Sequence, residues 1–256
     1  MPSAIWEVKN AKSLSLRIII ARLAKWSTAS HEARMRDPGE SDSDELAARG
    51  MQRLPFPKVE LLQMRRFLDP DFCEELIAMI DADRRPSTLA DHDGDMYFRT
   101  SETCDLPMDD PCTQRLEAML AELSGIDPTH GEPLQGQRYA VGQEFKAHCD
   151  YFNPDGQDWE KYCSVAGQRT WTFMVYLNST PEGGATRFPR LEKLFRPKQG
   201  MAVIWNNLTP EGEPNPYTLH HGMKPRRGEK YIITKWFRER GWAPLDYTEE
   251  MAASGV

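Results

Sequence analysis

Residues 230–237, K-Y-I-I-T-K-W-F, form the last strongly apolar run of the chain and indicate a β-strand. Two similar runs lie earlier, W-T-F-M-V-Y-L at 171–177 and M-A-V-I-W at 201–205. Loops rich in Gly, Pro and Asn separate the three runs, and such loops are typical of turns between strands. The second half of the chain is therefore predicted to consist mainly of short β-strands.

Two helices are predicted ahead of these strands. Asp69 and Asp110 each precede a proline, an arrangement that suits an N-cap followed by the first helical residue. Apolar residues then recur at helical spacing in both segments, and Gly125 is suited to end the second helix. Helices followed by many short strands predict a mainly β fold, a sandwich or barrel with supporting α-helices.

The composition excludes several classes of protein. The chain has 256 residues, with 32 Lys+Arg against 39 Asp+Glu and a net charge of −7, which argues against a general nucleic-acid binder. No uncharged apolar run approaches the roughly 18 residues of a transmembrane segment. The five cysteines form no C-x-x-C pair, and an odd number fits no disulfide framework. We expect a globular enzyme or binding module of the cytoplasm, without a signal peptide.

Three segments are predicted along the chain. Residues 1–53 combine a basic start with an acidic linker, residues 54–245 form the main domain, and residues 246–256 form a C-terminal tail. Apolar residues at helical spacing within 16–23, flanked by basic residues, predict an amphipathic helix. Such a helix could contact a membrane surface, dock on a partner or act as a transit peptide, but packing on the main domain or a frayed tail is favoured.

Six histidines are the strongest candidates for chemistry, and two pairs are informative. His148 and Asp150 would share one face of a strand and could begin a metal site. His220 or His221 could supply a second imidazole, because two His and one carboxylate suit non-haem Fe(II). Lys230 shares the face of the last strand with Ile232, Thr234 and Trp236, and a buried ammonium there needs an anionic partner. On spacing alone, a purely structural role for these residues stays open.

Four ordered motifs resemble one known family. They are R-T-S at 99–101, R-Y-A-V-G-Q-E-F-K-A-H-C-D-Y-F at 138–152, E-G-G-A-T-R-F-P at 182–189 and L-H-H-G-M-K-P-R-R-G-E-K-Y-I-I-T-K-W-F at 219–237. Together they resemble the prolyl 4-hydroxylase branch of the 2-oxoglutarate/Fe(II)-dependent dioxygenases. The resemblance extends from about residue 54 to 242 and does not cover the first fifty residues. It implies a double-stranded β-helix, the jelly-roll of cupins, backed by helices.

The resemblance also implies roles for individual residues. His148, Asp150 and His220 would bind Fe(II), and Lys230 would pair with the distal carboxylate of 2-oxoglutarate. Further residues would line the co-substrate or substrate pocket. For the co-substrate these are Tyr139 and Thr172, with Tyr176 as a second candidate beside Thr172, and for the substrate Trp236, Arg99 and Phe145.

The sequence departs from the family pattern at a few positions. His221 follows the expected ligand directly, although the register to Lys230 favours His220. Phe145 stands where the family often has Tyr, which removes a hydroxyl from the pocket. Residues 153–168 lie where the family varies and could form a lid. These departures concern the substrate more than the chemistry.

The function expected from the resemblance is dioxygenase chemistry that uses Fe(II), 2-oxoglutarate and O2, with ascorbate as a further candidate cofactor. The reaction would hydroxylate an unactivated C–H, releasing succinate and CO2, and the expected partner is a peptide or protein containing proline. A free amino acid or small metabolite is an alternative substrate. A cupin-like module that binds a metal without turnover is a third interpretation, and the complete set of His148, Asp150, His220 and Lys230 argues against it.

Overall fold

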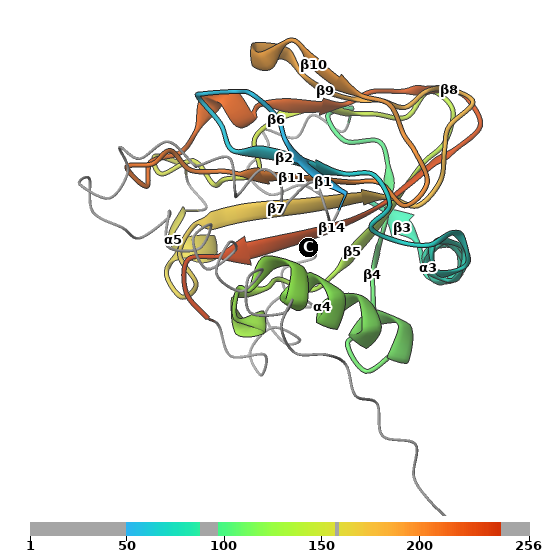
Figure 1. Ribbon diagram of the computed structural model, residues 1–256, viewed down its shortest axis with the longest axis horizontal. Helices are drawn as coiled ribbons and strands as arrows, with labels where there is room; N and C mark the ends of the chain where they lie inside the picture. The colour runs from blue at the N-terminus through green and yellow to red at the C-terminus, as the bar shows by residue number, and fades with distance from the viewer. Residues whose placement is uncertain (1–49, 88–96, 157–158, 242–256) are drawn as a thin grey trace, which may run out of the picture.

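The computed structural model describes residues 50–87, 97–156 and 159–241. The predicted amphipathic helix, the acidic linker and the C-terminal tail at 246–256 lie outside the described residues. In the described part, β-strands form two main sheets with helices outside them (Figure 1).

The larger sheet has eight strands and forms the back of the site. Its strands, in spatial order, are β1 (Met51–Arg53), β2 (Leu61–Met64), β11 (Ala202–Asn206), β7 (Arg169–Tyr176), β14 (Lys230–Arg238), β5 (Gln135–Tyr139), β4 (Glu102–Asp105) and β3 (Arg85–Pro86). The three apolar runs predicted as strands correspond to β7, β11 and β14, which lie side by side and antiparallel at the centre of this sheet.

The smaller sheet has four strands and forms the front. Its order is β10 (Lys193–Phe195), β9 (Thr186–Phe188), β12 (His220–Gly222) and β6 (Phe145–His148), and a separate pair joins β8 (Glu182–Gly183) to β13 (Pro225–Arg227). Short 3-10 turns at Pro128–His130, Pro189–Leu191 and Pro216–Thr218 connect some of the strands. The two sheets enclose a core to which both contribute large side chains, among them Tyr139, Tyr176, Phe188, Phe195 and Trp205.

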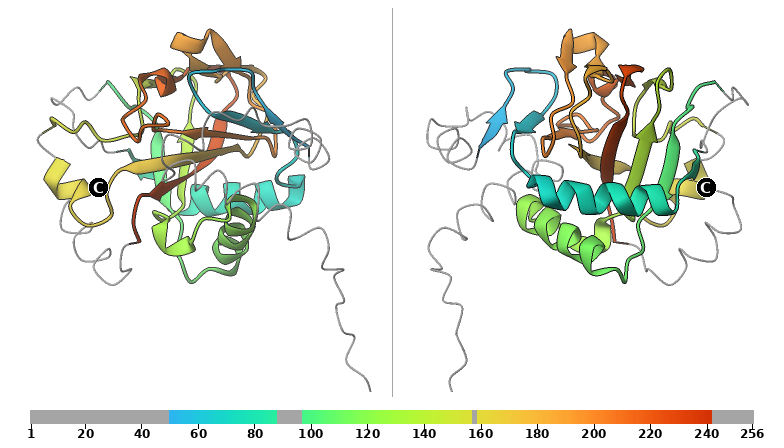
Figure 2. Two further views of the ribbon diagram at one scale, coloured as in Figure 1. Left: turned by 60° about the vertical axis from the view of Figure 1, so that its left-hand side comes forward. Right: turned by 90° about the vertical axis from the view of Figure 1, so that its right-hand side faces the viewer.

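Two helices cover the outer face of the larger sheet. Helix α3 (Pro70–Ala82) is capped by Asp69, whose carboxylate accepts a hydrogen bond from the backbone of Phe72. Helix α4 (Pro111–Ser124) is capped by Asp110 and ends at Gly125, which has a positive φ of 61°. Apolar side chains of both helices pack on the sheet, so that the helices lie side by side on one face of the domain (Figure 2). Both helix predictions are confirmed.

The prediction of a mainly β jelly-roll with supporting helices is confirmed by this arrangement, with two local differences. Met51 is buried in the larger sheet, so pairing already includes residues ahead of the predicted domain start at 54. Asp150 lies in a bend after β6, and the predicted strand ends at His148 instead. The strand ends there because β12 pairs only as far as the His148–His220 position.

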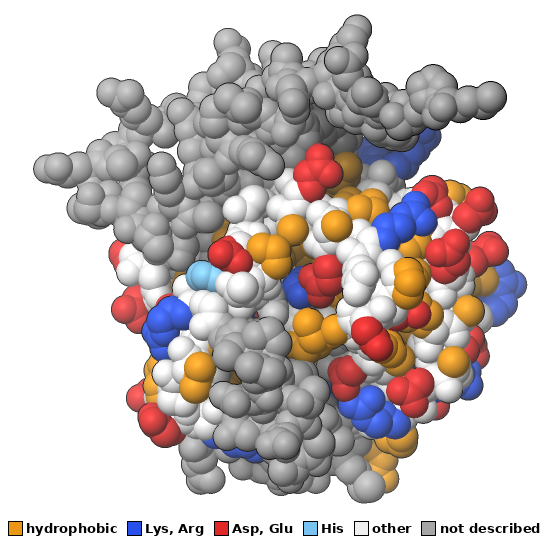
Figure 3. All heavy atoms as spheres, turned by 90° about the horizontal axis from the view of Figure 1, so that it is seen from below, with side chains coloured by type: hydrophobic (Ala, Val, Ile, Leu, Met, Phe, Trp, Pro, Cys, Tyr) orange, Lys and Arg blue, Asp and Glu red, His pale blue; other side chains and the backbone are white. Residues whose placement is uncertain are grey.

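The surface carries charges of both signs. On the described part of the face seen in Figure 3, acidic and basic side chains are intermingled with hydrophobic ones. No helix within the described residues has both the length and the hydropathy needed to cross a bilayer.

Candidate active site

Two of the three predicted metal ligands, His148 and His220, meet because β6 and β12 are antiparallel neighbours. His148 lies directly opposite His220, and the centroids of the two imidazole rings are 4.3 Å apart. Oδ1 of Asp150 lies 3.7 Å from Nε2 of His148 and 3.8 Å from Nε2 of His220. One potential ligand atom from each of the three residues lies within 4.8 Å of the others, so a single metal ion could contact all three.

Backbone carbonyls determine which nitrogen of each histidine faces this point. Nδ1 of His148 lies 2.7 Å from the carbonyl oxygen of Lys146, and Nδ1 of His220 lies 2.9 Å from that of Thr218. Each Nδ1 must carry a proton to donate to its carbonyl, which directs Nε2 toward the other ligands. Burial, together with the nearby His220, lowers the pKa of His148 well below its usual value. His148 therefore presents a neutral Nε2 with a lone pair for a metal.

Asp150 supplies the negative charge of this group. Burial raises its pKa, but the neighbouring His220, His148 and Arg169 outweigh that effect, together with a hydrogen bond from Thr172. The net pKa of Asp150 lies below its ordinary value, so the carboxylate is ionised when the site is formed.

The pocket between the sheets extends from these ligands to Lys230. All four residues predicted to share the inner face of β14 line it. The lining is Gln137, Tyr139, Phe145, Met174, Thr186, Trp205, Gly222, Lys230, Ile232, Thr234 and Trp236, together with His148, Asp150 and His220. The pocket thus joins a three-ligand metal site to a buried cation.

Lys230 is the feature of this pocket that lacks a charge partner. Its side chain is 1% exposed, and no carboxylate of the described residues lies within 4 Å of its ammonium. Nζ lies over the ring of Tyr139, its cross-strand neighbour, 3.7 Å from the centroid. Burial lowers the pKa of Lys230 to about 7. A carboxylate ligand would restore the charged form, because an anion favours the protonated ammonium.

The surroundings of Lys230 leave room for such a ligand. A Cβ built on Gly222 would lie 3.5 Å from Nζ of Lys230 and 3.6 Å from the hydroxyl of Tyr139, so the glycine keeps this corner open. The Tyr139 hydroxyl donates to Oε1 of Gln137 at 2.8 Å. This hydrogen bond holds the tyrosine hydroxyl in place within the pocket.

Phe145 and Arg99 stack on one side of the metal ligands. The ring of Phe145 lies on that of His148 with centroids 3.5 Å apart and planes at 16°. The guanidinium of Arg99 lies 4.9 Å from the Phe145 centroid. Its nitrogens donate to Ser101, Thr103 and Gln135, on and beside the larger sheet. Arg99 therefore connects the two sheets beside the pocket.

Two residues predicted for the co-substrate pocket have other contacts. Thr172 donates to Oδ2 of Asp150 at 2.7 Å, behind the metal ligands. Tyr176 donates to Oγ1 of Thr186 at 2.7 Å and is fully buried in the core. Neither is among the residues that line the pocket. The co-substrate contacts of all four residues stay a prediction, and of the four only Lys230 and Tyr139 line the pocket.

His221 points away from the other ligands. Its Nε2 lies 2.9 Å from Oε2 of Glu144, and Lys224 pairs with the same carboxylate at 3.2 Å. Successive residues of β12 face opposite sides, so only His220 faces the pocket. The choice between the two histidines, left open by spacing, is thus made by strand alternation.

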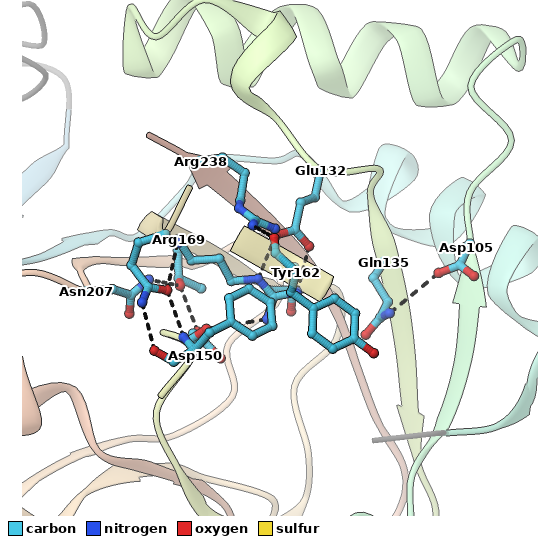
Figure 4. A network of polar contacts seen from close by, with 12 residues as sticks. Asp105, Glu132, Gln135, Asp150, Tyr162, Arg169, Asn207 and Arg238 are labelled. Carbon is cyan, nitrogen blue, oxygen red and sulfur yellow. Dashed lines mark hydrogen bonds and ion pairs between the residues drawn. The ribbon is translucent and has the colours of Figure 1, made fainter. Parts of the chain in front are cut away.

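A buried ion network beside Trp236 was not predicted from the sequence. Arg169 forms a two-pronged hydrogen bond with Glu132, at 2.7 and 2.6 Å, and Arg238 donates to the same carboxylate at 3.0 Å (Figure 4). Arg169 also lies 4.1 Å from the ring centroid of Trp236 and donates to the backbone carbonyl of Asp150. Burial raises the pKa of Glu132, but the two arginines more than offset this and lower it.

These residues could not be found from spacing because they come from separate elements. Glu132 precedes β5, and Arg169 begins β7 near the end of β14. The sequence does contain one pattern that could have indicated these residues. A charged residue directly precedes or follows the large apolar residues of a predicted strand. That pattern is common and does not by itself indicate a site.

Comparison with known proteins agrees with this fold and site. Residues 134–238 match the family model of the 2OG-Fe(II) oxygenase superfamily, and this stretch includes the three candidate ligands and Lys230. The fold and the matched stretch are therefore similar to those of a 2OG-Fe(II) oxygenase domain, a class that uses Fe(II), 2-oxoglutarate and O2.

Within that class, the predicted resemblance to the prolyl 4-hydroxylase branch is confirmed. The chain is 33% identical over 184 residues to prolyl 4-hydroxylase subunit alpha-1 of Gallus gallus. The matched region covers 69% of this chain and 36% of that protein. It is also similar to the solved structure of a viral collagen prolyl hydroxylase from Paramecium Bursaria Chlorella virus-1, in complex with 2OG. That likeness has a TM-score of 0.56 and 26% identity, and it covers 70% of this chain and 95% of the other.

A third comparison concerns the fold alone. A prolyl hydroxylase from Trichoplax adhaerens, solved with a peptide fragment of hypoxia inducible factor, has a TM-score of 0.54 and 14% identity, and covers 91% of this chain. Since the chain spans about a third of the length of the curated relative, the activity of the whole protein is treated below as a proposal.

The residues present fit a resident Fe(II) ion. Two imidazole nitrogens and one carboxylate oxygen are the donor set that suits non-haem Fe(II) and leaves coordination positions open. The histidines are oriented by carbonyls and the carboxylate by a hydroxyl, as in established metal sites.

Proposed function

We propose that this protein is an Fe(II)- and 2-oxoglutarate-dependent dioxygenase that hydroxylates a prolyl residue in a peptide or protein. The observation that carries the proposal is the shared pocket of His148, Asp150, His220 and Lys230. A metal triad alone would suit many reactions. A triad beside a buried, unpaired ammonium suits a co-substrate that is both a chelator and an anion.

His148, Asp150 and His220 would hold Fe(II) through Nε2, Oδ1 and Nε2. The bound iron supplies the oxidative step, in which one oxygen atom of O2 enters succinate, formed with CO2 from 2-oxoglutarate, and the other enters a C–H bond as hydroxyl. The protein provides three ligands on one side of the metal and leaves the remaining positions to the reactants.

Lys230 and Tyr139 would bind the distal carboxylate of 2-oxoglutarate. The ammonium can donate to that carboxylate, and its pKa would rise from about 7 toward its usual value once paired. Because Lys230 is 1% exposed, the pairing would take place away from water, where it is strong. This contact would orient the keto acid toward the metal ligands.

Trp236 and Phe145 would form the apolar walls beside the reacting C–H, since both line the pocket next to the ligands. Support for a prolyl substrate comes from the relatives: the chicken protein and the viral structure are both described as prolyl hydroxylases. This support favours a prolyl residue over a free amino acid or small metabolite.

The segment predicted as a lid would act as a wall. It contains helix α5 (Trp159–Cys163), and its backbone carbonyls accept hydrogen bonds from two arginines at the end of β14. Arg238 donates to Tyr162 and Gly167, and Arg240 donates to Val165. These bonds tie the segment to the larger sheet, so it would shape the groove for a peptide without closing over it.

The test combines binding and turnover with purified full-length protein. Anaerobic addition of Fe(II) and then 2-oxoglutarate is expected to produce a visible metal-to-ligand charge-transfer band. With O2 and a proline-rich peptide, succinate and a peptide heavier by one oxygen atom should appear in equal amounts. If neither the band nor succinate appears, the dioxygenase proposal is wrong. Oxidation of free L-proline instead of the peptide would refute only the proposed substrate.

A reducing compartment, the cytoplasm, is part of the proposal. All five cysteines are free, and three of them, Cys73, Cys104 and Cys163, are buried. Thiols in this state suit a compartment that keeps them reduced. Fractionation of the native cell with an antibody against the protein would test this assignment.

A further inference from the structure

A chain of hydrogen bonds leads from Trp205 to the carboxylate of Asp150. The indole Nε1 of Trp205 donates to Oδ1 of Asn207 at 3.0 Å, and Nδ2 of Asn207 donates to Oγ1 of Thr172 at 2.9 Å. The Thr172 hydroxyl then donates to Oδ2 of Asp150 at 2.7 Å. Trp205, Asn207 and Thr172 are 1%, 0% and 0% exposed, so water does not compete for these bonds.

The direction of every bond in the chain is determined. An indole N–H can only donate, so the oxygen of the Asn207 amide must face Trp205 and its nitrogen must face Thr172. The hydroxyl of Thr172 accepts from that nitrogen, which leaves its own proton for Asp150. Thr172 is therefore a donor to the carboxylate and cannot act as an acceptor there.

The fold brings these residues together through strand register. Trp205 on β11 lies directly opposite Thr172 on β7, and Asn207 follows Trp205 by two residues on the same face. The backbone nitrogen of Asn207 donates to the carbonyl of Thr170 at 2.7 Å, which keeps Asn207 beside β7 after β11 has ended. The series of hydrogen bonds thus rests on β11 and β7, two neighbouring strands of the larger sheet.

This series of hydrogen bonds contacts a metal ligand at each of its two ends. Because Oδ2 of Asp150 is bonded to Thr172, the oxygen that approaches the two Nε2 atoms is Oδ1, at 3.7 and 3.8 Å. At the other end, the ring of Trp205 packs on the imidazole of His220, with centroids 4.8 Å apart. One buried side chain therefore supports His220 directly and Asp150 through two intermediates.

We propose that Asn207 and Thr172 are positioning residues that keep Asp150 a ligand through one oxygen. With Oδ2 engaged, the carboxylate occupies one coordination position, and the positions needed by the reactants stay open. This inference rests on the proposed function, since it concerns the same metal site. It gives Thr172 a role behind the metal and not at the co-substrate.

The first test measures Mn(II) affinity of the purified full chain without 2-oxoglutarate. Thr172→Val removes the hydroxyl while keeping the shape, and we expect the affinity to fall about tenfold or more. Thr172→Ser restores a hydroxyl and should lie within about threefold of the wild type. The matched control is Thr170→Val, because Thr170 is buried on the same strand but donates to the carbonyl of Phe237.

A second variant and two further measurements separate positioning from a loss of folding. Asn207→Leu should lower Mn(II) affinity in the same way, since Thr172 then loses the donor that orients its hydroxyl. The metal-free melting temperature of each variant shows whether the protein is still folded. In the anaerobic Fe(II)–2-oxoglutarate complex, the charge-transfer band should shift in Thr172→Val and not in Thr170→Val.

The outcomes distinguish this inference from the proposed function. If the wild type binds Mn(II) and folded Thr172→Val binds it equally well, the positioning role is wrong and the proposed function stands. Weaker 2-oxoglutarate binding in that variant, with unchanged Mn(II) affinity, would also overturn the inference, because it would place Thr172 at the co-substrate. If the wild type binds no divalent metal, the proposed function itself fails.

Discussion

Lys230 and Lys235 lie on the same strand, β14, and both are buried, but they face opposite sides of the larger sheet. Lys235, 3% exposed, points to the helices and donates to Oε1 of Glu117 on α4 at 2.5 Å. Lys230, 1% exposed, points between the sheets, and its ammonium lies over the ring of Tyr139 with no carboxylate of the described residues within 4 Å. Burial lowers the pKa of both. The outer face pairs its lysine with a carboxylate of the protein, whereas the described residues of the inner face provide none for Lys230.

The largest expected effect is on the affinity for 2-oxoglutarate. Lys230→Met should weaken it about 100-fold or more, because a buried carboxylate of the ligand would lose its only counter-charge. Lys235→Met is the matched control and should leave the affinity unchanged. Isothermal titration with Mn(II) present would measure both. Equal losses in the two variants would contradict the distinction between the faces.

The same two variants should change stability in opposite directions. Lys235→Met leaves Glu117 without its partner and should lower the free energy of unfolding by about 2 kcal/mol, less than for a fully buried pair because Glu117 is partly exposed. Lys230→Met removes an unpaired buried ammonium, so the ligand-free protein should become more stable.

Denaturant titration of both variants, without metal or co-substrate, gives the sign of each change. A loss of stability in Lys230→Met would mean that its ammonium is compensated by the protein itself. In that case the Lys230 ammonium would not need the carboxylate of a ligand as its partner.

The smallest effect is a pH dependence of 2-oxoglutarate binding. In the free protein Lys230 has a pKa of about 7, and pairing with a carboxylate raises it, so binding takes up a proton above pH 7. The affinity should therefore be greatest below pH 7 and fall as the pH rises, by at most about tenfold per unit. Titrations at several pH values with saturating Mn(II) would show this slope, which Lys230→Met should lack.

Much of this arrangement could be predicted because it depends on short stretches of sequence. Asp69 and Asp110 start helices through bonds to nearby backbone nitrogens, and Gly125 ends one through its own positive φ. The alternation along β14 placed Lys230 and Trp236 on one face without knowledge of their surroundings. These features follow from interactions within a few residues, which is why the printed sequence reveals them.

Other features depend on which strands become neighbours. The role expected for Thr172 came from its place in β7, but its hydroxyl is directed to Asp150 by Asn207, which lies 35 residues further along the chain. Glu132 and Arg238 meet 106 residues apart. No local pattern predicts such pairs, because the same residues at the ends of strands are solvated in most proteins.

The sequence by itself determined the order of helices and strands and the inner face of β14, since each depends on local spacing, and its resemblance to a known family indicated the residues of the metal site. Only the tertiary structure decided that His220 and not His221 faces Asp150, and that Asp150 is held through Oδ2. It also decided that Lys235 has a carboxylate partner while Lys230 has none among the described residues. The physical reason is that charge pairing and buried hydrogen bonds depend on the distance between strands, which antiparallel register sets only after the sheets have formed.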